Sequence, residues 1–304
     1  MDLDKVLIAT VVGSFPTNPT KSSLARSYYE RNDPYLESLR DAVNAQIEAG
    51  IELVSDGQTR GNMIEIFAKG LKGFRIKEKI EIVSEVEHIG PITVEDVKET
   101  REMISDSEGV KGIITGPWTL VNSVENHHYD SDMNAVIDTA DSLKKEAEIL
   151  AEFCDVVQID EPYFSVDFPE CGKDIMEEIM DVKTKTALHV CGDIEPVVED
   201  LVEIDVDILD FEFAANPNLY EIFENISIDQ RVAAGVVTTD SDIEDIEEIK
   251  DNINRAYDIF GPKTMIDPDC GLRYLEKDTA IKKLENMVIA RNVVLNERNR
   301  EVRG

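Results

Sequence analysis

The chain has 304 residues, of which 42% are hydrophobic, and its 64 acidic and 31 basic side chains give a formal net charge of -33. This charge argues against a nucleic-acid partner, because phosphates would be repelled. No run of about 20 apolar residues is present, so no membrane span is expected. The N-terminus lacks a signal-peptide pattern, and we expect a cytoplasmic protein with a single domain, residues 1–304.

The acidic residues are spread along the chain, which is typical of a heavily solvated surface, as in a salt-rich cytoplasm. Electrostatic steering toward a basic protein is the alternative. The four cysteines are Cys154, Cys171, Cys191 and Cys270. Without a secretion signal we expect no disulfide framework.

Short apolar strands alternate with helices along the chain. Strands are expected at 7–12, 51–55, 110–115, 156–159, 186–190, 208–211, 232–237 and 264–266. Helices are expected at 35–49, 63–70, 94–107, 133–153, 173–180, 195–202, 241–260 and 278–298, with a short one before 232. The charged stretch up to Asp33 is expected to be a connection.

Nearly continuous apolar strands are typical of parallel strands buried on both faces. Eight of them, most followed by a helix, predict an α/β fold with a single (β/α)₈ TIM barrel. A doubly wound open sheet is the alternative. Residues 74–92 alternate Ile or Val with Lys or Glu, which does not fit the repeat and predicts a hairpin-like, exposed excursion.

Polar residues that follow the predicted strands should share one rim of the barrel. His189 and Cys191 are two apart on a strand, so their side chains point the same way. With Glu212 and Cys270, which follow later strands, they form a plausible four-ligand zinc set. Taken singly, His189 and Cys191 are also typical of a buried histidine and a buried thiol. Glu212 alone could be a helix cap or a salt-bridge partner, and Cys270 alone could be a turn residue. Asp193 could orient His189 or cap a helix.

Three further strand ends carry candidate substrate contacts. Asp160 could hold an amine, or it could cap the next helix. Val12, Gly13 and Ser14 could offer backbone N–H groups and a hydroxyl to a carboxylate, or form a simple turn. Gln58 is either a neutral pocket residue or a surface residue. Together with a thiophilic metal, these groups predict an amino-acid substrate that carries a thiol.

These stretches resemble the catalytic, C-terminal half of cobalamin-independent methionine synthase. The matching segments, in order, are 12–16 (VGSFP), 56–58 (DGQ) with Met63 and Phe67, 115–117 (TGP), 158–162 (QIDEP), 189–192 (HVCG) and 267–272 (DPDCGL). The resemblance implies a (β/α)₈ barrel in which one Zn²⁺ is held by His189, Cys191, Glu212 and Cys270. It implies L-homocysteine bound around Val12 to Ser14, with Asp160 near its amine and L-methionine as product.

Long members of that family carry a second, N-terminal barrel that helps to hold folate, and this chain resembles the short archaeal-type form. Three positions depart from the family pattern. Gln58 stands where a glutamate is usual, Asp240 stands at or near the proton-donating histidine, and Ser123 stands near the folate-contacting tryptophan. The departures favour a methylcorrinoid donor, methylcobalamin or a corrinoid protein, over folate. His127 and His128 could line the donor site or belong to a solvated loop.

The expected chemistry is methyl transfer to a thiol that the metal has deprotonated, because a free thiol is mostly protonated at neutral pH. Three alternatives remain open from the sequence: zinc-dependent transfer to another thiol such as coenzyme M, a non-catalytic zinc or corrinoid-protein partner, and a metal-free decarboxylase on the same barrel.

Overall fold

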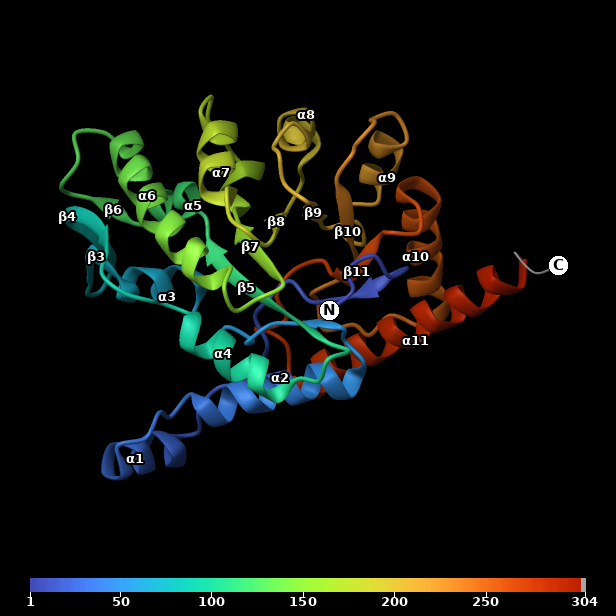
Figure 1. The fold of residues 1–304 in the computed structure, drawn as a ribbon, viewed down its shortest axis with the longest axis horizontal. Helices are drawn as coiled ribbons and strands as arrows, with labels where there is room; N and C mark the ends of the chain where they lie inside the picture. Colours follow the sequence, from blue (N-terminus) through green and yellow to red (C-terminus); the bar gives the residue numbers. More distant parts are fainter. Residues whose placement is uncertain (302–304) are drawn as a thin grey trace.

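Eight parallel strands form one sheet that closes on itself (Figure 1). The computed structural model describes residues 1–301. In spatial order the strands are β1 (Ile8–Ala9), β11 (Met265–Pro268), β10 (Arg231–Val237), β9 (Ile208–Phe211), β8 (Lys185–Val190), β7 (Val156–Asp160), β5 (Gly109–Thr115) and β2 (Leu53–Val54). A parallel bridge between Thr10 and Leu53 joins the two end strands. The predicted (β/α)₈ barrel is confirmed.

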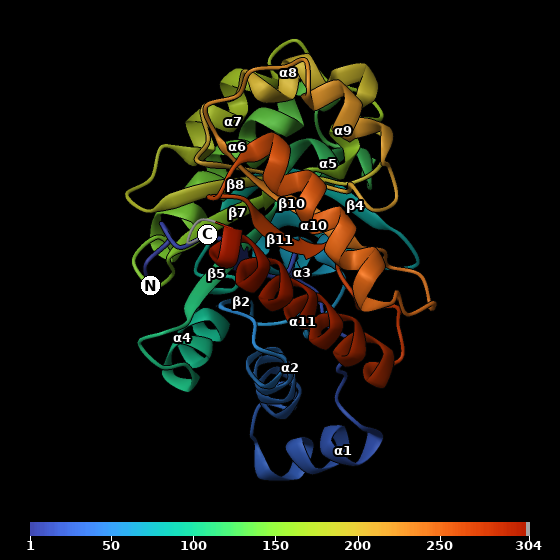
Figure 2. The same cartoon turned by 90° about the vertical axis from the view of Figure 1, so that its right-hand side faces the viewer.

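Helices follow the strands and surround the barrel, as Figures 1 and 2 show, except for the first helix, residues 21–30, which projects away from the barrel and has no buried residue. They are α1 (Lys21–Glu30), α2 (Leu36–Ala49), α3 (Met63–Gly70), α4 (Val94–Met103), α5 (Pro117–Asn122), α6 (Asp132–Leu150), α7 (Gly172–Met180), α8 (Val198–Val202), α9 (Asn218–Phe223), α10 (Ile246–Phe260) and α11 (Lys277–Glu301). Two short 3₁₀ helices, η1 (Pro162–Ser165) and η2 (Glu195–Val197), also follow strands. Within the described part of the chain, no helix combines the length and apolarity that crossing a bilayer requires.

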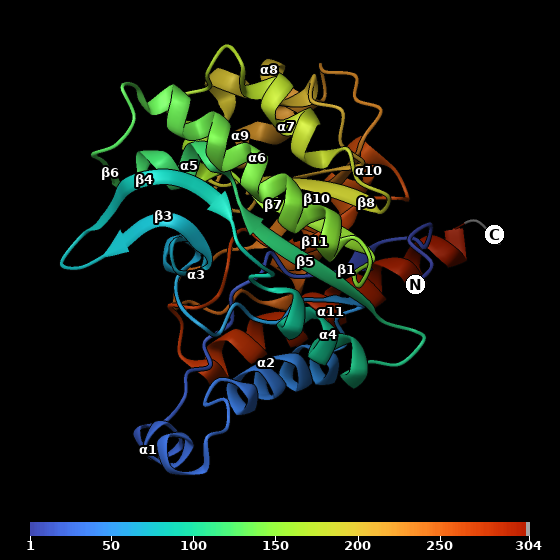
Figure 3. The same cartoon turned by 60° about the vertical axis from the view of Figure 1, so that its left-hand side comes forward.

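The excursion from the barrel is a hairpin of β3 (Leu71–Ile76) and β4 (Ile80–His88), shown in Figure 3. It starts and ends a few residues before the predicted 74–92. A third short strand, β6 (Glu125–Asn126), pairs with β4. The hairpin is not fully exposed, because Ile82 and Val86 are buried and β4 packs against α6.

The helices differ from the prediction most clearly at two places. The stretch before Asp33 contains α1, which Thr20 caps by accepting a hydrogen bond from the Ser23 backbone N–H. The helix predicted from 241 begins at Ile246, because Asp245 caps it through the Glu248 N–H. The Glu244 carboxylate is instead drawn to Thr238 and to the buried Lys283 ammonium.

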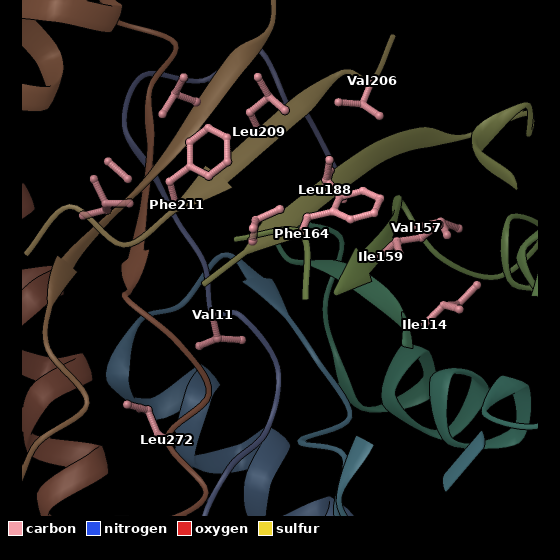
Figure 4. Close-up of a cluster of buried hydrophobic side chains, with 14 of the residues drawn as sticks. Val11, Ile114, Val157, Ile159, Phe164, Leu188, Val206, Leu209, Phe211 and Leu272 are labelled. Atoms are coloured by element: carbon pink, nitrogen blue, oxygen red, sulfur yellow. The ribbon is translucent and has the colours of Figure 1, made fainter. Parts of the chain in front are cut away.

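Side chains alternate between the two faces of the barrel wall. Outward-facing residues such as Leu188, Leu209 and Phe211 pack beneath the helices (Figure 4). The inward-facing floor is a separate apolar cluster: Ile8, Leu53, Val156, Ala187, Ile208, Ala233 and Met265. Two residues further along the strands, the interior becomes polar, with Lys111, Gln158, His189, Asp210 and Asp267 all buried. We call these five residues the buried polar layer.

Candidate metal and substrate site

Three of the four predicted metal ligands meet above the barrel floor. The ligand atoms of His189, Cys191 and Cys270 all lie within 4.8 Å of one another. His189 is 2% exposed, and neither of its ring nitrogens has a hydrogen-bond partner among residues 1–301, although Nδ1 lies 3.0 Å from Asp210 Oδ1. A buried imidazole nitrogen without a partner is costly unless something binds it. An imidazole with two thiols is a donor set that suits Zn²⁺, so these residues fit a bound zinc ion.

Glu212 lies outside that group. Its Oε2 accepts a hydrogen bond of 2.9 Å from the Gly192 N–H, just beyond Cys191. Burial raises the pKa of Glu212 above its ordinary value, although the Gly192 contact opposes the shift. The carboxylate therefore borders the thiol and imidazole group without joining it, and its role as a metal ligand remains a prediction.

The partner of His189 inside the barrel is Asp210, not Asp193. His189 Nδ1 lies 3.0 Å from Asp210 Oδ1, whereas the Asp193 carboxylate accepts the Glu195 N–H at the start of η2. Burial alone would lower the pKa of His189, but Asp210 outweighs it and the pKa lies well above its ordinary value. Asp193 therefore forms a local turn before η2, whose N-cap is Ile194, and it does not orient His189.

The loop that carries Cys270 is docked on the predicted substrate turn. The Leu272 N–H donates to the Ser14 carbonyl at 2.8 Å. A Cβ added to Gly271 would lie 2.1 Å from Ser14 Oγ, so any other residue would force the Ser14 hydroxyl to move. The thiol of Cys270 and the hydroxyl of Ser14 therefore face one cavity.

That cavity has a volume of about 220 Å³ and brings the predicted substrate and metal residues together. Its lining includes Val12, Ser14, Gln58 and Asp160 together with His189, Cys191 and Cys270. Gly13 does not line it but packs behind, where a Cβ would lie 2.6 Å from Ile113. The cavity has room for a small molecule. Such a molecule could contact both the thiols of Cys191 and Cys270 and the carboxylate of Asp160.

Asp160 points into the cavity and caps no helix. It is 6% exposed, and the Gln158 side-chain amide donates to its Oδ1 at 2.7 Å. Burial raises the pKa of Asp160 to about 6. The neighbouring Glu161 takes the capping role, because it accepts the backbone N–H groups of Trp118 and Thr119 at the start of α5.

The cavity lining also includes residues to which no sequence pattern assigned a role. Asn62, Met63, Thr239, Arg273 and Tyr274 complete the lining with Pro162. Arg273 donates to the carbonyl oxygens of Gln58 and Gly61, which ties two rim loops together. Tyr274 is 90% exposed at the mouth. The sequence could have indicated Arg273 as a cavity residue, because it directly follows the DPDCGL segment.

Asp240, predicted as a catalytic group, does not line the cavity. Its side chain is 64% exposed, and its Oδ1 accepts the Asp242 N–H in a local turn. The adjacent Thr239 reaches the cavity instead. A proton-transfer role for Asp240 therefore remains a prediction with no cavity contact behind it.

His127 and His128 lie beside the hairpin, not in the cavity lining. His127 Nε2 is 3.2 Å from Glu125 and 3.9 Å from Glu81. Both carboxylates are already paired, with Lys79 and Arg75. This group is best described as a surface ion-pair network, and His128 stacks edge-on against Tyr129.

A parallel (β/α)₈ barrel that gathers an imidazole, two thiols and a buried carboxylate around one cavity at the carboxyl ends of its strands defines a barrel enzyme with a candidate metal centre. Residues 7–292 match the family described as the catalytic domain of cobalamin-independent synthase. The chain belongs to this family and is a methyltransferase of the methionine synthase type.

Two relatives agree with this assignment, and a solved structure agrees in its fold. The chain is 36% identical to a methionine synthase of Methanocaldococcus jannaschii, over 95% of this chain and 99% of that protein. It is 38% identical to a methionine synthase of Methanothermobacter thermautotrophicus, over 93% and 99%. The fold matches a B12-independent methionine synthase of a Shewanella species, solved with selenomethionine, with a TM-score of 0.85 and 24% identity over 96% and 98%.

Proposed function

We propose that this enzyme transfers a methyl group to the thiol of L-homocysteine and forms L-methionine. One zinc ion would be held by His189, Cys191 and Cys270, with Glu212 as the fourth ligand. The observation that carries the proposal is that the first three donor groups cluster within 4.8 Å and line the same cavity as Ser14 and Asp160. The relatives named as methionine synthases support it.

The protein's own groups would hold an amino acid in one orientation. Asp160 would accept the substrate amine, and the turn at Val12 to Ser14 would take the carboxylate through its N–H groups and hydroxyl. Gln58 adds a neutral hydrogen-bonding group beside them. A sulfonate such as coenzyme M has no amine for Asp160, which favours homocysteine. When bound, the zinc ion would supply a deprotonated substrate sulfur at neutral pH.

We propose a methylcorrinoid, free or carried on a protein, as the methyl donor. Support comes from the two positions where the folate-using members carry other residues, Asp240 and Ser123. Asp240 lies outside the cavity and Ser123 ends α5. The exposed Tyr274 at the mouth leaves the cavity accessible from the rim.

The test is methyl transfer by zinc-loaded protein with each donor and each thiol. We expect methionine from homocysteine and methylcobalamin, and little product from 5-methyltetrahydrofolate or from coenzyme M. A higher rate with the folate would overturn the donor assignment. Zinc binding with no methionine from either donor would favour a carrier or corrinoid-protein partner instead.

Replacing Glu212 with glutamine should test its place in the metal site. Glutamine keeps an oxygen for the Gly192 N–H but removes the negative charge. If Glu212 binds zinc, we expect the zinc affinity to fall by at least about tenfold, measured by chelator competition. An unchanged affinity would assign Glu212 to the Gly192 contact alone. Glu195→Gln, an exposed site on η2, is the matched control.

A further inference from the structure

The neighbour of His189 within the buried polar layer is set by strand register. In the parallel pair β8 and β9, His189 lies opposite Asp210. Both side chains point into the barrel and are 2% and 1% exposed. Their closest polar atoms, His189 Nδ1 and Asp210 Oδ1, are 3.0 Å apart. The contact is thus built into the pairing of two core strands and does not depend on a mobile loop.

The two ring nitrogens of His189 face different chemistry. Because Nδ1 faces Asp210, Nε2 is the atom left for the sulfurs of Cys191 and Cys270. A neutral imidazole carries one N–H, and an ionised carboxylate can only accept a hydrogen bond. A proton on Nδ1 satisfies Asp210 and leaves the lone pair of Nε2 free, as a metal ligand requires.

Asp210 lies among the other members of the buried polar layer. Asp267 and Lys111 are buried in the same layer. Lys111 is 2% exposed, and its Nζ is fixed 2.8 Å from the Val11 carbonyl, next to the substrate turn. A buried carboxylate would be costly without a partner. The register of β8 and β9, and not a hydrogen bond from the rest of the layer, places Asp210 beside the imidazole.

We propose that Asp210 is a positioning residue that holds the Nδ1–H of His189, so that Nε2 faces the two cysteine sulfurs as the metal donor. This inference rests on the proposed metal site but not on the identity of the thiol or methyl donor. Nothing in the sequence motifs assigned a role to Asp210, because the contact arises only when β9 pairs with β8.

The direct test is the nitrogen NMR spectrum of zinc-loaded protein labelled with ¹⁵N-histidine. The chain has four histidines, and spectra of His88→Gln, His127→Gln and His128→Gln assign the remaining ring. We expect the proton of His189 on Nδ1 and the metal on Nε2. Metal on Nδ1, or a proton on Nε2, would overturn the proposal without any substitution in the barrel.

Three substitutions distinguish the contact between Asp210 and His189 Nδ1 from a general effect of the buried polar layer. Asp210→Leu removes the acceptor at similar volume, Asp210→Asn keeps an acceptor oxygen, and Asp267→Asn changes another carboxyl group of the same layer and leaves Asp210 in place. Zinc affinity by chelator competition should fall about 10- to 100-fold in the leucine variant and much less in both asparagine variants. The Co²⁺ absorption spectrum should change in the same order.

Equal losses in Asp210→Leu and Asp267→Asn would overturn the proposal, because they would point to the layer as a whole and not to the Nδ1 contact. If Asp210→Leu fails to fold, Asp210→Ala, which also removes the acceptor, decides: a mixture of His189 tautomers in the metal-free ring spectrum supports the role of the carboxylate, and an unchanged spectrum with unchanged zinc affinity contradicts it. Absence of methionine formation in the wild-type protein would remove the proposed function and leave these readouts unaffected.

Discussion

Replacing Cys270 with serine should release zinc and abolish methyl transfer. Cys270 contributes one of the two thiols of the cluster, and an alcohol is a far weaker zinc ligand than a thiolate. Loss of an outer partner of a metal ligand already costs 10- to 100-fold in affinity, so loss of the ligand itself should cost at least about a hundredfold. Zinc content by elemental analysis and methionine formation measure the two effects.

Cys171→Ser is the matched control for this experiment. Cys171 is half-buried, and its Sγ packs 3.4 Å from Met133 Sδ, away from the cavity. It should keep full zinc content and full activity. A Cys270→Ser protein that behaved in the same way would show that Cys270 is not a ligand. The pattern of loss in one variant alone also separates a metal effect from general thiol loss.

Replacing Asp160 with asparagine should weaken homocysteine binding and stabilise the protein. A charge-assisted hydrogen bond to the substrate amine is worth about 1.5–3 kcal/mol, which corresponds to about a 10- to 150-fold loss in kcat/KM. We expect the loss to appear mainly in KM, because zinc and the thiols are untouched. Asp167→Asn, on the exposed segment after η1, is the control.

The pH dependence follows from the raised pKa of Asp160. Because only the ionised carboxylate can hold an ammonium group, KM for homocysteine should rise as the pH falls through about 6 in the wild-type protein. The Asp160→Asn protein should lack this rise. A wild-type KM that stays constant between pH 5 and 7 would contradict the assignment, as would the same rise in the asparagine variant.

Asp160→Asn should weaken substrate binding but increase the free energy of unfolding. The pKa of Asp160 is higher in the folded protein than its ordinary value of 3.8, so the folded state binds more protons between about pH 4 and 6. The free energy of unfolding therefore falls as the pH rises through this window. Asp160→Asn should remove that cost and gain on the order of 1–3 kcal/mol at pH 7, measured by denaturant unfolding. Gain in stability with loss of binding is the expected mark of a substrate contact.

Sequence by itself determined the barrel and the positions of its reactive groups. The apolar strands and the 3.6-residue helices are local patterns, and a parallel barrel brings every strand end to one rim. The spacing of His189 and Cys191 follows from the twofold repeat of a strand. The short motifs around Ser14, Asp160 and Cys270 then indicated which strand ends share a cavity.

Only the tertiary structure decided which atoms meet within that rim. Whether Asp210 or Asp193 supports His189 depends on the register of β9 against β8, and no local repeat encodes the register between strands separated by a helix. Three other contacts also depend on the tertiary structure. They are the hydrogen bond from the Gly192 N–H to Glu212, the close approach of Gly271 to Ser14, and the pairing of β6 with β4 of the hairpin. Local periodicity fixes which way a side chain points, whereas closure of the barrel fixes what it faces.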